Sequence, residues 1–156
     1  MKRVGVIGLG DMGSGLAKNL IAHGFETTGF DLSAARLRAF AEIGGHAAQS
    51  VAEVAASADA VYVMVMTGDQ AKSVILGPEG LAARMPSGGG IILSATIKPS
   101  EARAIGAAMQ DADVALIDSP VSGGFPGAQS GTLTMMAAGP QQALDQYVDV
   151  MQAVSK

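Results

Sequence analysis

The sequence predicts an α/β fold with a doubly wound, mainly parallel sheet and one added antiparallel strand near the C-terminal end. Two observations predict it. Short apolar runs alternate with helical patterns along most of the chain, which is the order of βαβ units. These runs are apolar on both alternating faces, as expected for parallel strands that helices cover on both sides.

Five runs are predicted to be strands: residues 3–9, 27–31, 60–66, 90–95 and 114–118. Four stretches between them have the apolar spacing of helices: residues 12–23, 33–45, 50–57 and 99–109. Their ends carry the expected signals, because Gly24 follows the first helix, Ser33 caps the second and Pro99 opens the last.

The alternation of strands and helices changes after residue 118. Residues 119–131 are rich in Gly, Ser and Pro and are predicted to form a long loop. The following run, residues 132–139, is predicted to be a strand, and its short approach favours antiparallel pairing. A last helix is predicted over about residues 140–153.

Composition excludes several classes of function. Hydrophobic residues make up 49% of the 156 residues and charged residues 15%, so one folded domain is expected. The net charge is −4 without a Lys/Arg cluster, so neither nucleic acid nor a membrane is an expected partner. The chain has no cysteine and only two histidines, so no metal site is expected. No run is long enough for a membrane span and no signal peptide is recognisable, so we expect a cytoplasmic protein.

A glycine-rich turn, GLGDMG at residues 8–13, follows the first predicted strand and opens the first predicted helix. That context is the one in which G-x-G-x-x-G binds a dinucleotide in a Rossmann-type domain. Gly8 would allow the tight turn, Gly10 the close approach of a pyrophosphate, and Gly13 the packing of helix on strand. We expect the whole turn to bind the cofactor, with the Asp11 side chain facing solvent: Gly8, Leu9, Gly10, Asp11, Met12 and Gly13.

Asp31 ends the second predicted strand, 18 residues after Gly13. A carboxylate at that place accepts hydrogen bonds from a ribose 2′-hydroxyl and repels a 2′-phosphate. No arginine follows it immediately, since Arg36 and Arg38 belong to the next helix. We therefore expect NAD rather than NADP as the cofactor. The alternative is that Asp31 only caps the loop before Ser33.

Two later stretches, SATIKPSEA (residues 94–102) and DSPVSGGFPGAQSGTLTMMAAG (residues 118–139), join GLGDMG in a pattern that covers the whole chain. The sequence resembles the β-hydroxyacid dehydrogenase family, which includes 3-hydroxyisobutyrate, tartronate semialdehyde, threonate and 6-phosphogluconate dehydrogenases. The resemblance implies that the substrate carboxylate is bound by Ser122, Gly123 and Gly124. It also implies that the nicotinamide end of the cofactor is lined by Met66, Thr67 and Thr96.

The sequence departs from the family pattern in one motif. Members that oxidise 3-hydroxyisobutyrate typically show Asp-x-Ser-Thr where this chain has Leu93, Ser94, Ala95 and Thr96. The chain still resembles the 3-hydroxyisobutyrate dehydrogenases overall, but this departure weakens the assignment of 3-hydroxyisobutyrate as substrate and leaves a threonate-like or other β-hydroxyacid open.

Catalysis is expected to need residues outside this chain. In the family, the general acid/base is a lysine on a long helix that opens a second, all-helical domain. Lys98 lies in the right loop region but not at that position, so we assign no catalytic residue. The resemblance implies that residues 1–156 are the NAD-binding domain of a longer, homo-oligomeric enzyme whose helical domain catalyses and dimerises.

Three functions therefore compete. The leading prediction is an NAD-dependent oxidoreductase that transfers a hydride between NAD and a small, carboxylate-bearing β-hydroxyacid. An imine reductase would share the architecture but generally prefers NADPH, which Asp31 disfavours. A nicotinamide-binding module without catalysis is the third possibility. A methyltransferase that uses S-adenosylmethionine also combines glycines with a strand-end acid, but it fits the later motifs poorly.

Overall fold

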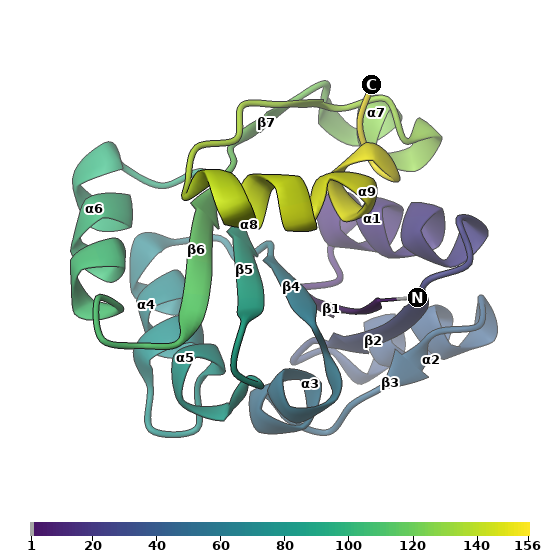
Figure 1. Cartoon of the computed structure of the whole chain (residues 1–156). Coiled ribbons are helices and arrows are strands. Elements are labelled where there is room, and N and C mark those ends of the chain that lie inside the picture. The colour runs from purple at the N-terminus through teal and green to yellow at the C-terminus, as the bar shows by residue number, and fades with distance from the viewer. Residues whose placement is uncertain (1) are drawn as a thin grey trace.

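The computed structural model describes residues 2–156 and contains a six-stranded parallel sheet between two layers of helices (Figure 1). Its strands are β1 (Arg3–Ile7), β2 (Glu26–Phe30), β3 (His46–Ala47), β4 (Ala60–Val63), β5 (Gly89–Leu93) and β6 (Val114–Asp118). They lie in the order β3-β2-β1-β4-β5-β6, and every neighbouring pair is parallel. From β1 the sheet extends through β2 and β3 on one side. The chain then crosses to the other side of β1 and continues with β4, β5 and β6. The carboxyl ends of β1 and β4 therefore form the crevice where open α/β sheets bind ligands.

Helices cover both faces of the sheet. One core lies against α1 (Asp11–Ala22), α2 (Ala34–Glu42), α7 (Gly124–Ser130), α8 (Gln141–Gln146) and α9 (Val148–Gln152). The other lies against α3 (Val51–Ser57), α4 (Gly68–Leu76), α5 (Leu81–Arg84) and α6 (Pro99–Ala108). Strand side chains alternate between the cores, so Tyr62 faces the first while Val61 and Val63 face the second. Within residues 2–156, no helix has the length and apolar character to cross a membrane.

The predicted fold class and its five strands are confirmed, and the differences lie in short elements. Strand β3 was not predicted because it has only two residues, and α4 and α5 were not predicted between residues 66 and 90. The predicted loop at residues 119–131 is wrong in part, since it contains β7 (Val121–Ser122) and α7. The predicted last helix is interrupted at Tyr147, between α8 and α9.

The antiparallel strand near the C-terminal end is present but shorter than predicted. Strand β8 (Thr134–Met135) pairs with β7 in a separate two-stranded sheet. Farther along, Ala138 forms an antiparallel bridge with Asp118, at the end of β6. The two-stranded sheet is thus tied to the carboxyl edge of the main sheet, beside the crevice.

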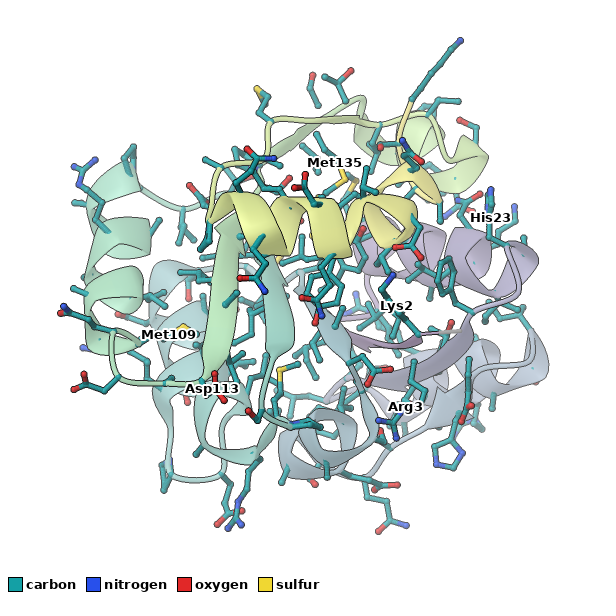
Figure 2. The ribbon with its side chains drawn as sticks, viewed as in Figure 1. Lys2, Arg3, His23, Met109, Asp113 and Met135 are labelled. Atoms are coloured by element: carbon teal, nitrogen blue, oxygen red, sulfur yellow. The ribbon has the colours of Figure 1, made fainter. Side chains whose placement is uncertain are left out.

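Helices α8 and α9 lie across β4, β5 and β6 and close one core (Figure 1). The Tyr147 ring occupies the space over Gly90, where a Cβ would overlap the ring. Its hydroxyl lies 3.0 Å from the carbonyl oxygen of Asp59 and 2.9 Å from that of Gly88, so the ring is held in place. The chain start is tied to the same layer, because the Lys2 ammonium (Figure 2) lies 2.8 Å from the Asp149 carboxylate.

The contact between Gly90 and Tyr147 yields a stability prediction. Gly90→Ala should lower the free energy of unfolding by about 1–3 kcal/mol, because the added methyl group meets a buried ring that two carbonyls hold. Urea denaturation followed by circular dichroism measures the change. If steric overlap is the cause, Gly90→Ala should cost much less in a Tyr147→Leu background than alone. Equal costs in the two backgrounds would show that the ring is not the obstacle.

Candidate functional site

The three glycines of the turn at residues 8–13 have different surroundings. Gly8 has φ +94°, and a Cβ there would overlap the Met64 carbonyl. A Cβ on Gly13 would overlap the carbonyl oxygen of Gly8, so α1 begins closer to β1 than any side chain allows. Gly10 has φ −69°, and its nearest neighbour outside the turn would be the Arg36 guanidinium, 3.8 Å from the added atom. The fold therefore requires glycine at positions 8 and 13 but not at 10.

The start of α1 is open to a ligand. Gly10 is its N-cap and makes no side-chain capping hydrogen bond with the described residues, so first-turn amides are available to an anion. The Asp11 side chain is exposed, while Met12 packs partly against the core. Gly10 itself leaves the backbone at the start of α1 bare, as a pyrophosphate cradle needs, and the nearest side chain to that space is Arg36.

Asp31 follows β2 directly and is tied to the glycine turn. Its side chain is 10% exposed, and Oδ2 accepts a hydrogen bond of 2.8 Å from the Leu9 amide. Oδ1 accepts another, also 2.8 Å, from the Ser33 amide. The second contact is the loop-capping role that the sequence left open as the alternative. A carboxylate has about four lone-pair sites, so two backbone bonds leave room for a ribose hydroxyl.

Arg36 is the site residue that sequence reasoning missed. Although it belongs to α2, its Nη1 atom lies 3.6 Å from Asp31 Oδ2, and its guanidinium stands beside Gly10. The sequence gives no direct sign of this contact. Helical spacing relates only residues of one helix, and Asp31 lies before α2. No arginine follows Asp31 immediately in the sequence, as expected. In the folded chain, however, the side chain of Arg36 lies beside Asp31.

The predicted nicotinamide-side residues lie after β4 and β5, at the same edge of the sheet. Met66 is 84% exposed, and Thr96 is also exposed. Thr67 is the N-cap of α4, and its Oγ1 accepts a hydrogen bond of 3.1 Å from the Gln70 amide. The pair Thr67-x-x-Gln70 resembles a capping box, and this signal could have revealed α4 from the sequence.

The predicted carboxylate-binding residues lie at the exposed start of α7. Ser122 ends β7, and Gly123 and Gly124 have φ +130° and +58°, conformations that favour glycine. Helix α7 packs on α1, where a Cβ on Gly15 would lie 2.7 Å from the backbone of Ala128. The structure thus brings the two predicted binding loops onto one pair of helices.

A side-chain amide reinforces that packing. Asn19 Nδ2, on α1, donates to the carbonyl oxygens of Gly15 and Ala128, each at 2.8 Å. Helix α1, which begins in the glycine turn, therefore holds α7, the helix that follows the predicted carboxylate-binding residues.

Polar groups gather where β5 and β6 end. Burial raises the pKa of the Asp118 carboxyl above its usual range. The buried hydroxyls of Ser94 and Ser119 have no hydrogen-bond partner among residues 2–156. Leu93 and Asp118, the last residues of β5 and β6, are paired in the sheet. Ser94 and Ser119 directly follow them, so the two serines lie at the same edge of the sheet. Lys98 is exposed at the start of α6.

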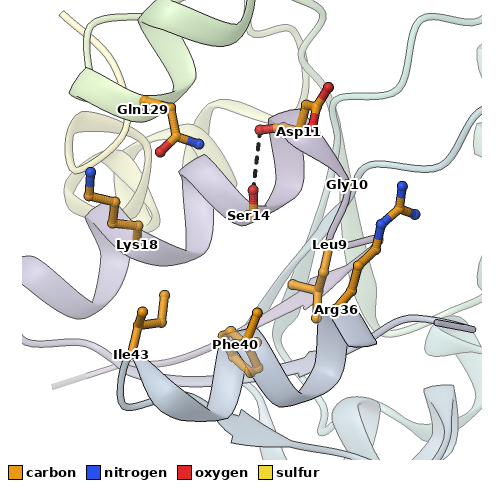
Figure 3. A pocket seen from close by; sticks show the side chains of 10 residues that line it. Leu9, Gly10, Asp11, Ser14, Lys18, Arg36, Phe40, Ile43 and Gln129 are labelled. Carbon is orange, nitrogen blue, oxygen red and sulfur yellow. Dashed lines mark hydrogen bonds between the residues drawn. The ribbon is translucent and has the colours of Figure 1, made fainter. Parts of the chain in front are cut away.

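A groove of about 370 Å³ lies between α1 and α2 (Figure 3). Arg36 stands beside Gly10 at one part of it, and Lys18 projects from α1 farther along. Its lining comes from the glycine turn, α1, α2 and α7: Leu9, Gly10, Asp11, Ser14, Lys18, Arg36, Ala39, Phe40, Ile43 and Gln129.

Comparison with known proteins places this geometry among nicotinamide-dependent enzymes. A family described as the NAD binding domain of 6-phosphogluconate dehydrogenase matches residues 3–156. An L-threonate dehydrogenase from Cupriavidus necator is 39% identical over 99% of this chain and 52% of its own length. An NAD-dependent L-serine dehydrogenase from Pseudomonas aeruginosa is 35% identical over 100% of this chain and 52% of its own length.

Solved structures agree with this assignment. A 3-hydroxyisobutyrate dehydrogenase from Salmonella typhimurium superimposes with a TM-score of 0.94 at 33% identity, covering 100% of this chain and 54% of that one. An imine reductase from Myxococcus stipitatus superimposes with a TM-score of 0.92 at 20% identity, over 99% of this chain and 53% of that one. The second likeness is one of fold alone. The chain spans about half the length of the curated relatives it matches.

The contacts of Asp31 predict that it stabilises the domain even without a ligand. Asp31→Ala should lower the free energy of unfolding by about 1–3 kcal/mol, because the Leu9 and Ser33 amides lose their acceptor. Chemical denaturation of the ligand-free protein measures this. Asp111→Ala, at an exposed aspartate far along the chain, is the control and should have little effect. Equal stability of the two variants would contradict a structural role for Asp31.

Proposed function

The chain belongs to the family of NAD-binding domains described for 6-phosphogluconate dehydrogenase, and we propose that it is the cofactor-binding part of a β-hydroxyacid dehydrogenase. The reaction would transfer a hydride between NAD and a small hydroxyacid that carries a carboxylate. The observation that carries the proposal is the free space at Gly10. The fold itself has room for a side chain there, whereas a side chain would block a bound pyrophosphate.

The residues present fit a dinucleotide. The open amides at the start of α1 and the bare backbone at Gly10 would hold the pyrophosphate. The free lone pairs of Asp31 would accept a ribose hydroxyl, and the Leu9 amide keeps that carboxylate in place. The nicotinamide side would be bordered by residues that follow β4 and β5 at the carboxyl edge of the sheet: Met66, Thr67 and Thr96.

The substrate would meet the Ser122 hydroxyl and the backbone of Gly123 and Gly124 with its carboxylate. A hydroxyl and exposed amides make a compact site for an anion. The relatives are dehydrogenases named for L-threonate, L-serine and 3-hydroxyisobutyrate, which are small hydroxyacids. Because Leu93-Ser94-Ala95-Thr96 departs from the motif typical of 3-hydroxyisobutyrate oxidation, we propose a threonate-like β-hydroxyacid as substrate class.

When bound, the nicotinamide supplies the hydride chemistry, and the protein orients it and moves the proton. We assign proton transfer to no residue of this chain, since Lys98, exposed at the start of α6, does not lie at the position of the family's catalytic lysine. A lysine of a further, helical domain is proposed for that step, in keeping with relatives about twice as long. The homo-oligomeric state and cytoplasmic location stay predictions.

The first test concerns binding by this chain. Gly10→Val should weaken NADH binding by at least about tenfold, because the side chain would occupy the pyrophosphate cradle. A fluorescence titration with NADH measures the affinity, and thermal melting should show that the fold persists. Gly106→Ala, within α6 and away from the crevice, is the matched control. Unchanged affinity in Gly10→Val would refute the proposed pyrophosphate site.

The second test separates cofactor binding from turnover. Residues 1–156 should bind NADH without appreciable dehydrogenase activity, because positioned acid–base catalysis is worth about 10²–10⁴-fold. The whole protein should oxidise members of a panel of β-hydroxyacids, assayed through NADH formation. Comparable turnover from both would place the catalytic group within this chain. Binding without turnover in the whole protein would favour the non-catalytic module, and turnover only with imines the imine reductase.

A further inference from the structure

We propose that Glu101 is a positioning residue for the nicotinamide end of the cofactor. Its carboxylate holds the start of α4 against α6, and so sets where Met66 and Thr67 lie. Glu101 acts through these residues and does not itself contact the cofactor. The inference rests on the proposed function, because it requires the nicotinamide to lie where β4 and β5 end.

The loops that follow β4 and β5 are joined by the sheet only at their first residues. The Ser94 amide donates to the carbonyl oxygen of Val63 at 3.1 Å, which is the last hydrogen bond of this strand pair. Farther along, no hydrogen bond within residues 2–156 links residues 64–70 to residues 95–101. Other contacts therefore set the distance between the two loops.

The Glu101 side chain supplies such a contact. It lies in the first turn of α6, and its carboxylate occupies the place where a Cβ on Gly68 would lie. Gly68 is the first residue of α4, and its φ is not positive, so its backbone conformation does not require glycine. The missing side chain instead leaves room for the carboxylate. Helices α4 and α6 lie side by side on one face of the sheet (Figure 1).

Electrostatics favours a carboxylate at this place. The start of a helix carries a partial positive charge on its free amides, and the amides of Gly68 and Asp69 have no acceptor among residues 2–156. The Asp69 side chain is a like charge in the same turn, but it is exposed, so solvent and salt screen its repulsion of Glu101. Charge and shape therefore both hold Glu101 at the start of α4.

The start of α4 carries with it two of the residues proposed to border the nicotinamide. Thr67 Oγ1 accepts from the Gln70 amide at 3.1 Å, and Gln70 Oε1 accepts from the Met66 amide at 2.8 Å. Met66 and Thr67 are thus fixed to α4 by its own capping bonds. Thr96 lies on the other loop, ahead of Glu101. A shift of α4 away from α6 would therefore move Met66 and Thr67 relative to Thr96.

The test compares NADH with adenosine diphosphate ribose, which has the adenosine and the pyrophosphate but no nicotinamide. Both are titrated by calorimetry against residues 1–156. Glu101→Ala should weaken NADH binding by about three- to tenfold, the loss typical of one displaced polar contact. Binding of adenosine diphosphate ribose should change by less than about twofold, as for a distant surface substitution. Glu101→Gln keeps the length of the side chain and one acceptor oxygen, so it should retain most of the NADH affinity.

A second variant reaches the same contact from the other helix. Gly68→Ala alone should weaken NADH binding to a similar extent, because the methyl group takes the place of the carboxylate. In a Glu101→Ala background, Gly68→Ala should have little further effect, since no carboxylate is left to displace. Asp111→Ala removes an exposed carboxylate just after α6 and is the control, which should change neither affinity.

The outcomes separate a positioning role from a structural one. An equal loss of affinity for both ligands, or no loss for NADH, would overturn the role of Glu101, because a purely structural role acts on the whole domain. An unmodified chain that binds the two ligands equally overturns this inference alone, since the nicotinamide then makes no contact to be positioned. One that binds neither ligand overturns the proposed function too.

Discussion

The close approach of α1 to strand β1 is the constraint on which the rest of the site depends. The first turn of α1 stands against the carbonyl of Gly8, where a Cβ at Gly13 has no room. That approach aims the start of the helix at the crevice between β1 and β4. It also lets the Leu9 amide reach Asp31 at the end of β2. The turn, the helix and the acid form one rigid unit because backbone, rather than a flexible side chain, sets their spacing.

The second loop depends on the same helix. Helix α7 has only seven residues and includes Pro126 and Gly127, so its own propensity to form a helix is weak. It forms because α1 offers it a surface without side chains at Gly15, and because Asn19 binds the carbonyl of Ala128. A loop proposed to bind a carboxylate is thereby held at a fixed distance from the turn proposed to bind the pyrophosphate.

The sequence predicts the elements whose signals are local and long. The buried strands, α1 and α6 follow from apolar spacing and from glycine or proline at their ends. Strand β3 is too short to carry a pattern, and α7 reads as a loop because packing against α1 overrides composition. Within the site, the glycine turn and Asp31 stand out in the sequence. Arg36 does not, since Asp31 precedes α2 and only the folded structure shows that the two side chains lie 3.6 Å apart.

The dependence of α7 on α1 also governs how a domain of this kind can diverge. Ser122, at the end of β7, and Phe125, in the first turn of α7, are exposed, so changes there are expected to leave the packing of α7 on α1 intact. Gly15 has no such freedom, because one added methyl group would displace α7 from α1. A mutation there would be pleiotropic, acting on the fit of two ligands at once. Descendants of one ancestral sequence could therefore drift to new substrates while selection keeps the helical interface unchanged.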